Sequence, residues 1–102
     1  KSRAWLIATS AEKFKLESGG GNFVEYRWTP EGKAEPNLTY YICDDCGVRT
    51  HAEGTGPGGA KTVAVQVATI EDADPDVLAQ SIHFVDGRHD AFDRPPADTR
   101  LL

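Results

Sequence analysis

The 102-residue sequence has no methionine and only two cysteines. Its longest nearly charge-free run, residues 62–70, is far shorter than the roughly 20 residues of a membrane-spanning helix, so we predict no membrane partner. Because the chain starts at Lys1 and lacks methionine, we expect an upstream segment and treat the chain as N-terminally incomplete. Two cysteines are too few for the disulfide framework of a small secreted domain, which favours a reducing, cytoplasmic location.

Positive charge is also scarce. The sequence has 11 Lys and Arg against 16 Asp and Glu, a net charge of −5 with histidine neutral. Nucleic-acid binding depends on Lys and Arg to neutralise phosphates, and no basic cluster offsets the deficit, so we predict no nucleic-acid partner. Hydrophobic residues make up 39% of the chain, which is enough for one folded domain over residues 1–102.

Turn-forming residues recur about every 8–12 residues, a spacing typical of a mainly β domain. Short apolar or alternating runs predict strands at residues 4–8, 15–17, 23–28, 38–42, 48–52, 62–68 and 82–85. We expect residues 15–17 and 23–28 to form a hairpin through the glycine-rich loop 18–22. Along residues 23–28, Phe23, Glu25 and Arg27 alternate with Val24, Tyr26 and Trp28, so one face of that strand is expected to be buried.

Two single-turn helices are also predicted. Thr9 and Glu12 have the spacing of a capping box, which indicates one turn over residues 9–14. Asp74 before Pro75 resembles an N-cap followed by a first-turn proline, and indicates one or two helical turns through residue 80. We expect residues 29–37 to be a surface loop and residues 88–102 to be an extended polar tail.

The strongest local motif is a Cys-x-x-Cys between two predicted strands, formed by Cys43 and Cys46 and followed by Gly47. A two-residue spacer lets a tight turn aim two thiolates at one zinc ion, at about 2.3 Å from each sulfur. Structural zinc needs four ligands, so the other pair must come from elsewhere in the chain, from an upstream segment or from a second subunit. A redox dithiol is less favoured, because a strand and not a helix follows, and two free thiols are a further alternative.

The three histidines are candidates for the missing ligands. His51 follows the cysteines on the adjoining strand, and either approaches the zinc site or faces solvent. His83 alternates with apolar neighbours, which indicates an exposed strand histidine. His89, next to Arg88, either contacts an anionic group or lies in a surface turn.

Residues 54–59 formally fit the G-x-G-x-x-G pattern of dinucleotide-binding proteins. That pattern needs a strand before it and a helix after it, whereas a valine-rich strand run follows here. We therefore interpret residues 54–59 as a flexible hairpin loop.

Four segments occur in an order that resembles the C-terminal two-thirds of the glutathione-dependent formaldehyde-activating enzyme family. They are residues 41–50 (YICDDCGVRT), 63–67 (VAVQV), 86–90 (DGRHD) and 96–100 (PADTR). The resemblance implies a β-tent fold, in which mostly antiparallel strands surround zinc. It also implies a carbon–sulfur lyase reaction that joins formaldehyde and glutathione into S-hydroxymethylglutathione.

In that family, Cys43 and Cys46 match the late cysteine pair that holds structural zinc. The early pair and the catalytic cysteines have no counterpart here, so the resemblance implies a catalytic zinc segment upstream of Lys1 and no catalytic residue within this chain. The implied partners are a small-molecule thiol such as glutathione and an aldehyde. A homo-oligomer is also an open expectation. The alternative function is a zinc-stabilised, non-enzymatic protein-binding module.

Overall fold

A computed structural model describes residues 4–89 and 91–100 of the chain. Within these residues the fold is mainly β, with a five-stranded antiparallel sheet, one α-helix and short 3-10 helices. The chain divides into two compact units, one spanning Trp5–Ile70 and the other taking in the rest of the described residues. No helix in the described ranges is long and apolar enough to cross a membrane.

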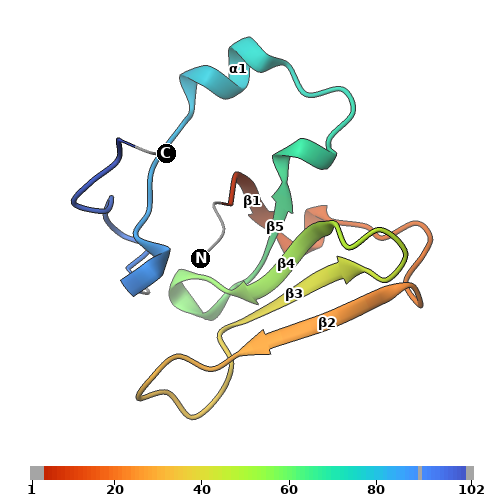
Figure 1. The fold of residues 1–102 in the computed structure, drawn as a ribbon, viewed down its shortest axis with the longest axis horizontal. Helices are drawn as coiled ribbons and strands as arrows, with labels where there is room; N and C mark the ends of the chain where they lie inside the picture. Colours follow the sequence, from red (N-terminus) through yellow and green to blue (C-terminus); the bar gives the residue numbers. More distant parts are fainter. Residues whose placement is uncertain (1–3, 90, 101–102) are drawn as a thin grey trace. The chain divides into compact units, whose positions relative to one another are not determined.

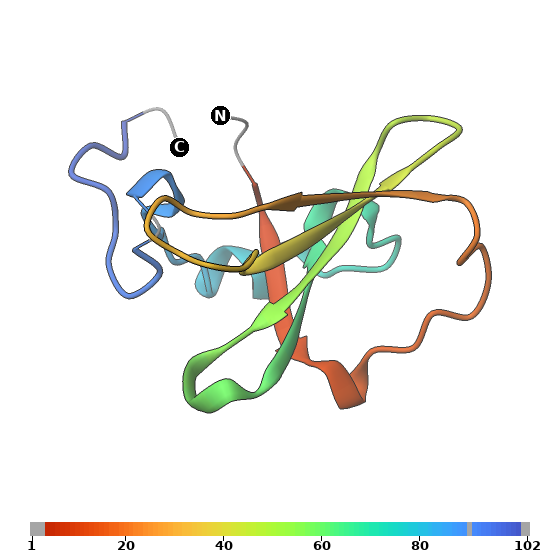
Figure 2. The same ribbon diagram turned by 90° about the horizontal axis from the view of Figure 1, so that it is seen from below.

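The first unit contains the whole sheet, in the order β1-β5-β4-β3-β2 (Figure 1). Its strands are β1 (Leu6–Ser10), β2 (Phe23–Trp28), β3 (Leu38–Cys43), β4 (Arg49–Thr55) and β5 (Lys61–Gln66). Every neighbouring pair is antiparallel. Figure 2 shows that the strand direction turns strongly between β2 and β1, as the right-handed twist of a sheet requires. β4 is therefore central, while β1 and β2 are the edges.

The most buried side chains lie on the central strands. Ala52 on β4 and Val63 on β5 are each 2% exposed, and His51 on β4 is 5% exposed. Among the described residues, no large side chain is less than 2% exposed. The sheet therefore depends on its backbone hydrogen bonds and on half-buried side chains as well as on a small apolar core.

Several predicted elements are confirmed. The strand over residues 23–28 has the expected bounds, and those expected at 38–42, 48–52 and 62–68 occur with shifted ends. The predicted first strand begins two residues later, at Leu6. The helix α1 (Pro75–Gln80) belongs to the second unit, and its N-cap is the predicted one, because Asp74 Oδ1 accepts a hydrogen bond from the Asp76 N–H at 2.9 Å. The predicted hairpin loop 54–59 occurs with shifted ends, because Gly54 and Thr55 belong to β4 and residues 56–60, with the short η2 turn (Pro57–Gly59), lead into β5.

Other predictions are wrong. Residues 15–17 form no strand, and β2 pairs with β3 instead of forming a hairpin with them. The expected buried face of β2 is also absent, because every side chain from Val24 to Trp28 is exposed. Because residues 15–17 do not pair with it, β2 is an edge strand with only β3 beside it in the described sheet.

The capping box is wrong as well. Thr9 belongs to β1, and the 3-10 helix η1 (Ala11–Lys13) begins after Ser10 without a side-chain cap. In the second unit, residues 82–85 form no strand, and Asp86 instead makes an isolated antiparallel bridge to Ala91. The 3-10 helix η4 (Gly87–His89) occupies the start of the expected tail, and residues 92–100 contain neither helix nor strand.

Gly54 marks a close approach between β4 and β3. A Cβ atom built on Gly54 would lie 2.5 Å from Leu38 Cδ2 and 2.9 Å from the Asn37 carbonyl oxygen. We expect Gly54→Ala to lower the free energy of unfolding in urea by about 1–3 kcal/mol, because the neighbouring strand must shift. Gly21→Ala is the control, since nothing lies within 4 Å of its Cβ position. Equal stability of the two variants would contradict this packing.

Candidate functional site

The Cys-x-x-Cys forms the tight connection between β3 and β4. The Gly47 N–H donates to the Cys43 carbonyl at 2.9 Å, and the Cys43 N–H donates to the Val48 carbonyl at 2.8 Å. Gly47 has a φ of 75°, the left-handed conformation that glycine adopts without strain. The Asp44 N–H also donates to the Asn22 carbonyl at 2.9 Å, which ties this turn to the residue before β2.

The turn lowers the pKa of the Cys43 thiol below its ordinary value. The main cause is the backbone N–H of Cys46, followed by the backbone N–H of Asp45 and the Cys46 side chain, while burial and the Asp44 charge act in the opposite direction. Cys43 is half-buried and Cys46 is exposed, and both are free cysteines. Backbone donors aimed at a sulfur favour the thiolate, which is the form that binds metal.

The cysteine turn brings two thiol groups together. Within residues 4–89 and 91–100, no group of three or more His, Cys, Asp or Glu side chains could hold a metal ion. Two thiolates at a tight turn fit half of a tetrahedral zinc site. Among the described residues, His51 therefore forms no three-donor group with Cys43 and Cys46.

His51 is not a solvent-facing residue either. Its imidazole stacks on the Tyr41 ring with centroids 4.5 Å apart and planes within 7°. The rings of Phe14 and Phe23 lie 4.9 Å and 5.4 Å from it. His51 thus lies at the centre of an aromatic cluster formed by these four rings. Both sequence expectations for His51 are wrong.

A β-bulge places His51 in this cluster. The β3–β4 register passes from Tyr41 opposite His51 to Ile42 opposite Arg49, which leaves Thr50 as the extra residue. The Thr50 hydroxyl lies 2.8 Å from His51 Nδ1 and gives that nitrogen a hydrogen-bond partner. A one-residue irregularity of this kind has no signature in the alternation of side chains, so sequence reasoning missed both the bulge and the cluster.

Glu53 is a charged neighbour of the aromatic cluster. The Tyr41 hydroxyl donates to Glu53 Oε2 at 3.0 Å, and burial together with this carboxylate raises the pKa of Tyr41. Burial lowers the pKa of His51, while the Glu53 charge opposes the change. His51 is therefore neutral at neutral pH and acts as a packed polar side chain of the sheet.

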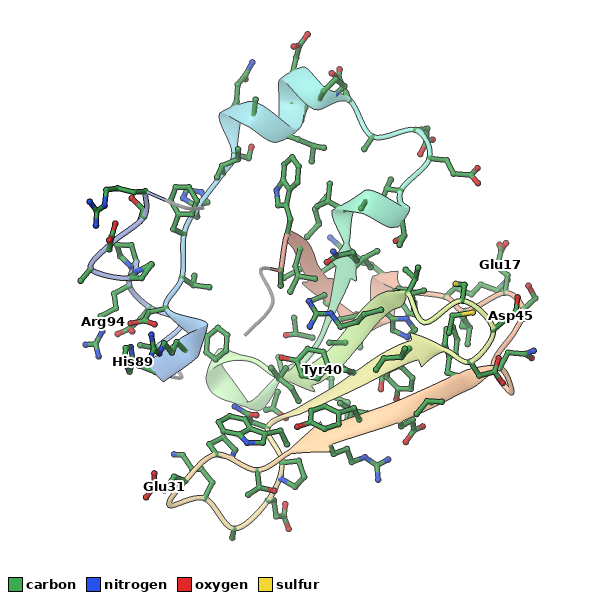
Figure 3. All side chains as sticks on the ribbon, in the orientation of Figure 1. Glu17, Glu31, Tyr40, Asp45, His89 and Arg94 are labelled. Atoms are coloured by element: carbon green, nitrogen blue, oxygen red, sulfur yellow. The ribbon has the colours of Figure 1, made fainter. Side chains whose placement is uncertain are left out.

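The other two histidines belong to the second unit. His83 is exposed as expected, but it does not lie on a strand. His89 lies in the η4 surface turn, where its Nδ1 is 2.7 Å from Asp86 Oδ2 (Figure 3). This hydrogen bond is the main cause that lowers the pKa of Asp86. The surface-turn interpretation of Arg88 and His89 is confirmed.

Comparisons with known proteins found no matching family model, no matching curated protein and no matching solved structure. The described site thus defines a small antiparallel β protein with a thiolate-favouring Cys-x-x-Cys turn. The family resemblance of its motifs stays a prediction from the sequence.

We predict that the buried His51 makes stability depend on pH. Its folded pKa lies below the ordinary value of 6.5, so the unfolded chain binds a proton that the folded chain resists. Stability is full above that ordinary value and declines as the pH falls below it, by at most roughly 1.4 kcal/mol per pH unit. Urea unfolding on both sides of this value measures the decline.

The matched comparison is His51→Phe against His83→Gln. His51→Phe keeps an aromatic ring in the cluster but removes the titrating group, so we expect it to flatten the pH dependence. His83→Gln removes an exposed imidazole of the other unit and should leave the decline in place. An unchanged decline in His51→Phe would show that His51 is not its source.

Proposed function

We propose that Cys43 and Cys46 form half of a zinc site. We further propose that the protein containing this chain is a zinc-dependent carbon–sulfur lyase acting on thiol–aldehyde adducts, similar to S-hydroxymethylglutathione synthase. The metal part of the proposal is carried by the geometry of the β3–β4 turn, and the reaction class by the resemblance of the ordered motifs.

The turn is suited to a metal before any metal binds. Backbone N–H groups of Cys46 and Asp45 point at the Cys43 sulfur and lower the pKa of its thiol. Gly47 holds the left-handed conformation that lets the chain return into β4. Because little reorganisation is needed, the binding free energy is not spent on ordering this turn.

The remaining ligands come from outside the described residues, which contain no third donor beside the cysteines. A bound zinc ion supplies Lewis-acid polarisation of a carbonyl and a lowered pKa for a coordinated thiol. The contribution of this chain is to hold two thiolates on a rigid β connection. We assign no catalytic or cofactor-binding residue among the described positions.

The partners proposed for the complete site are a small-molecule thiol, such as glutathione, and an aldehyde, such as formaldehyde. Two free thiols at the surface of the sheet unit suit a reducing compartment, which supports the proposal of a cytoplasmic location.

A second candidate is a zinc-stabilised protein-binding module without catalysis. The observation that favours it is the exposure of large apolar side chains along β2, where Val24 is 54% and Tyr26 is 51% exposed. In this function the zinc would only stiffen the sheet, and the exposed strand would carry the recognition.

Zinc content and activity together separate the two functions. We expect Cys43→Ser and Cys46→Ser each to weaken zinc binding by more than about 100-fold, a larger loss than that from a group that only supports a ligand. Asp45→Ser is the matched control, because it alters the same turn and keeps the backbone N–H that faces the Cys43 sulfur. Zinc is measured by native mass spectrometry and by a metal-sensitive dye.

The activity assay follows adduct formation from formaldehyde and glutathione by carbon-13 NMR. The full-length protein should accelerate it, and Cys43→Ser should abolish the acceleration. Zinc binding without acceleration would favour the binding module. A protein that binds no zinc, and whose Cys46→Ser variant is as stable as the parent, would contradict both functions and leave a redox dithiol.

A further inference from the structure

The edge strand β2 has the properties of a pairing surface. Among the described strands it pairs with β3 alone, and its sequence FVEYRW contains neither proline nor lysine. Natural edge strands are usually blunted by such residues, by bulges or by a cover, because an unpaired row of backbone groups pairs readily with another strand. β2 pairs with β3 without a register shift.

The direction of the free backbone groups follows from one hydrogen bond. The Asn22 carbonyl accepts from the Asp44 N–H at 2.9 Å, and Phe23 lies opposite Cys43, so Phe23 and Cys43 form a non-hydrogen-bonded pair. Because antiparallel pairs alternate, the N–H and C=O groups of Glu25 and Arg27 point away from β3 toward the free edge.

β2 has one face with charged side chains and one face with large apolar and aromatic side chains. Glu25 and Arg27 share one face, where Arg27 Nη2 lies 2.6 Å from Glu25 Oε2. Val24, Tyr26 and Trp28 share the other, exposed face. On the apolar face the ring of Tyr26 lies beside that of Tyr40, its partner on β3, with ring centroids 6.2 Å apart.

We propose that β2 pairs antiparallel with β2 of a second copy of this chain, about a two-fold axis at Tyr26. In this register Glu25 lies opposite Arg27 of the second copy, and Arg27 opposite its Glu25. The outward backbone groups of Glu25 and Arg27 then complete hydrogen-bonded pairs. Val24 lies opposite Trp28 of the second copy on the apolar face.

Charge complementarity selects this register over its neighbours. An axis at Glu25 would place two Glu25 carboxylates opposite each other, and like charges directly opposite are destabilising. An axis between two residues would place the apolar face of one copy beside the charged face of the other. The register centred on Tyr26 satisfies both faces at once. The contact uses none of the residues of the cysteine turn.

The experiment measures the mass of the 102-residue chain in solution by sedimentation and light scattering. We expect twice the 11.1 kDa of one chain. Arg27→Glu and Glu25→Arg should each weaken self-association by about tenfold or more, since each places like charges opposite each other. Mixing the two variants should restore pairing, because both arginines on the strand of one variant then face glutamates on the strand of the other.

Controls separate the contact from folding and from metal. Glu31→Arg makes the same charge change as Glu25→Arg in the exposed loop after β2 and should leave the dimer intact. The exposed ion pair of Glu25 and Arg27 contributes little to stability, so circular dichroism should show folded variants. The dimer should persist in EDTA and in Cys43→Ser, so its loss there would assign the dimer to zinc and overturn the β2 contact.

Crosslinking tests the register. A non-hydrogen-bonded pair has Cα atoms about 4.5 Å apart, within disulfide range, so Tyr26→Cys should link to itself between copies on oxidation. Val24→Cys, on the same exposed face, lies out of reach of its counterpart and should not. A wild-type chain that is monomeric up to about 1 mM, or a dimer indifferent to both charge reversals, would overturn the proposal.

Discussion

The ladder between β3 and β4 is the interaction on which the other features of the sheet unit depend. Its closed end is the cysteine turn, where the backbone of Cys43 bonds to both Gly47 and Val48. A bulge next to that end displaces Thr50 and brings His51 opposite Tyr41. The same ladder leaves the far side of β3 to β2, which therefore becomes an edge. The cysteine turn, the aromatic cluster and the open strand are consequences of one pairing register.

Because the apolar core of this sheet is small, a polar side chain, His51, contributes to its packing. His51 is almost fully buried, and it remains tolerable because its ring contacts aromatic rings while Nδ1 meets the Thr50 hydroxyl. The pKa of His51 falls because burial disfavours the charged form of its ring. The charge of Glu53 partly offsets this fall in pKa, and its carboxylate also accepts a hydrogen bond from the Tyr41 hydroxyl. The aromatic cluster around His51 thus takes the place of the large, fully buried apolar side chains that other sheets contain.

The sequence predicted the structural elements well where a few neighbouring residues determine the backbone conformation. Asp74 before Pro75 and the alternation of β2 each specify a backbone conformation within a few residues, and each is found in the structure. Features that depend on contacts between residues far apart in the sequence could not be predicted. Nothing in residues 23–28 says that β2 is an edge, so its exposure was missed. The position of His51 depends on a bulge and on Phe14, which is distant in sequence.

The pairing of β1 with β5 has a different consequence, for the order of folding. Leu6 lies opposite Gln66, so the two strands meet only after nearly the whole sheet unit has been brought together. Closing so long a loop is entropically costly, whereas β3 and β4 need only a tight turn. β1 is therefore expected to dock late and to detach first in local openings, with its amide hydrogens exchanging faster than those of the β3–β4 hairpin. We therefore expect the hairpin that carries the two thiols to be the most persistent part of the sheet, and the N-terminal strand to be the first part to open.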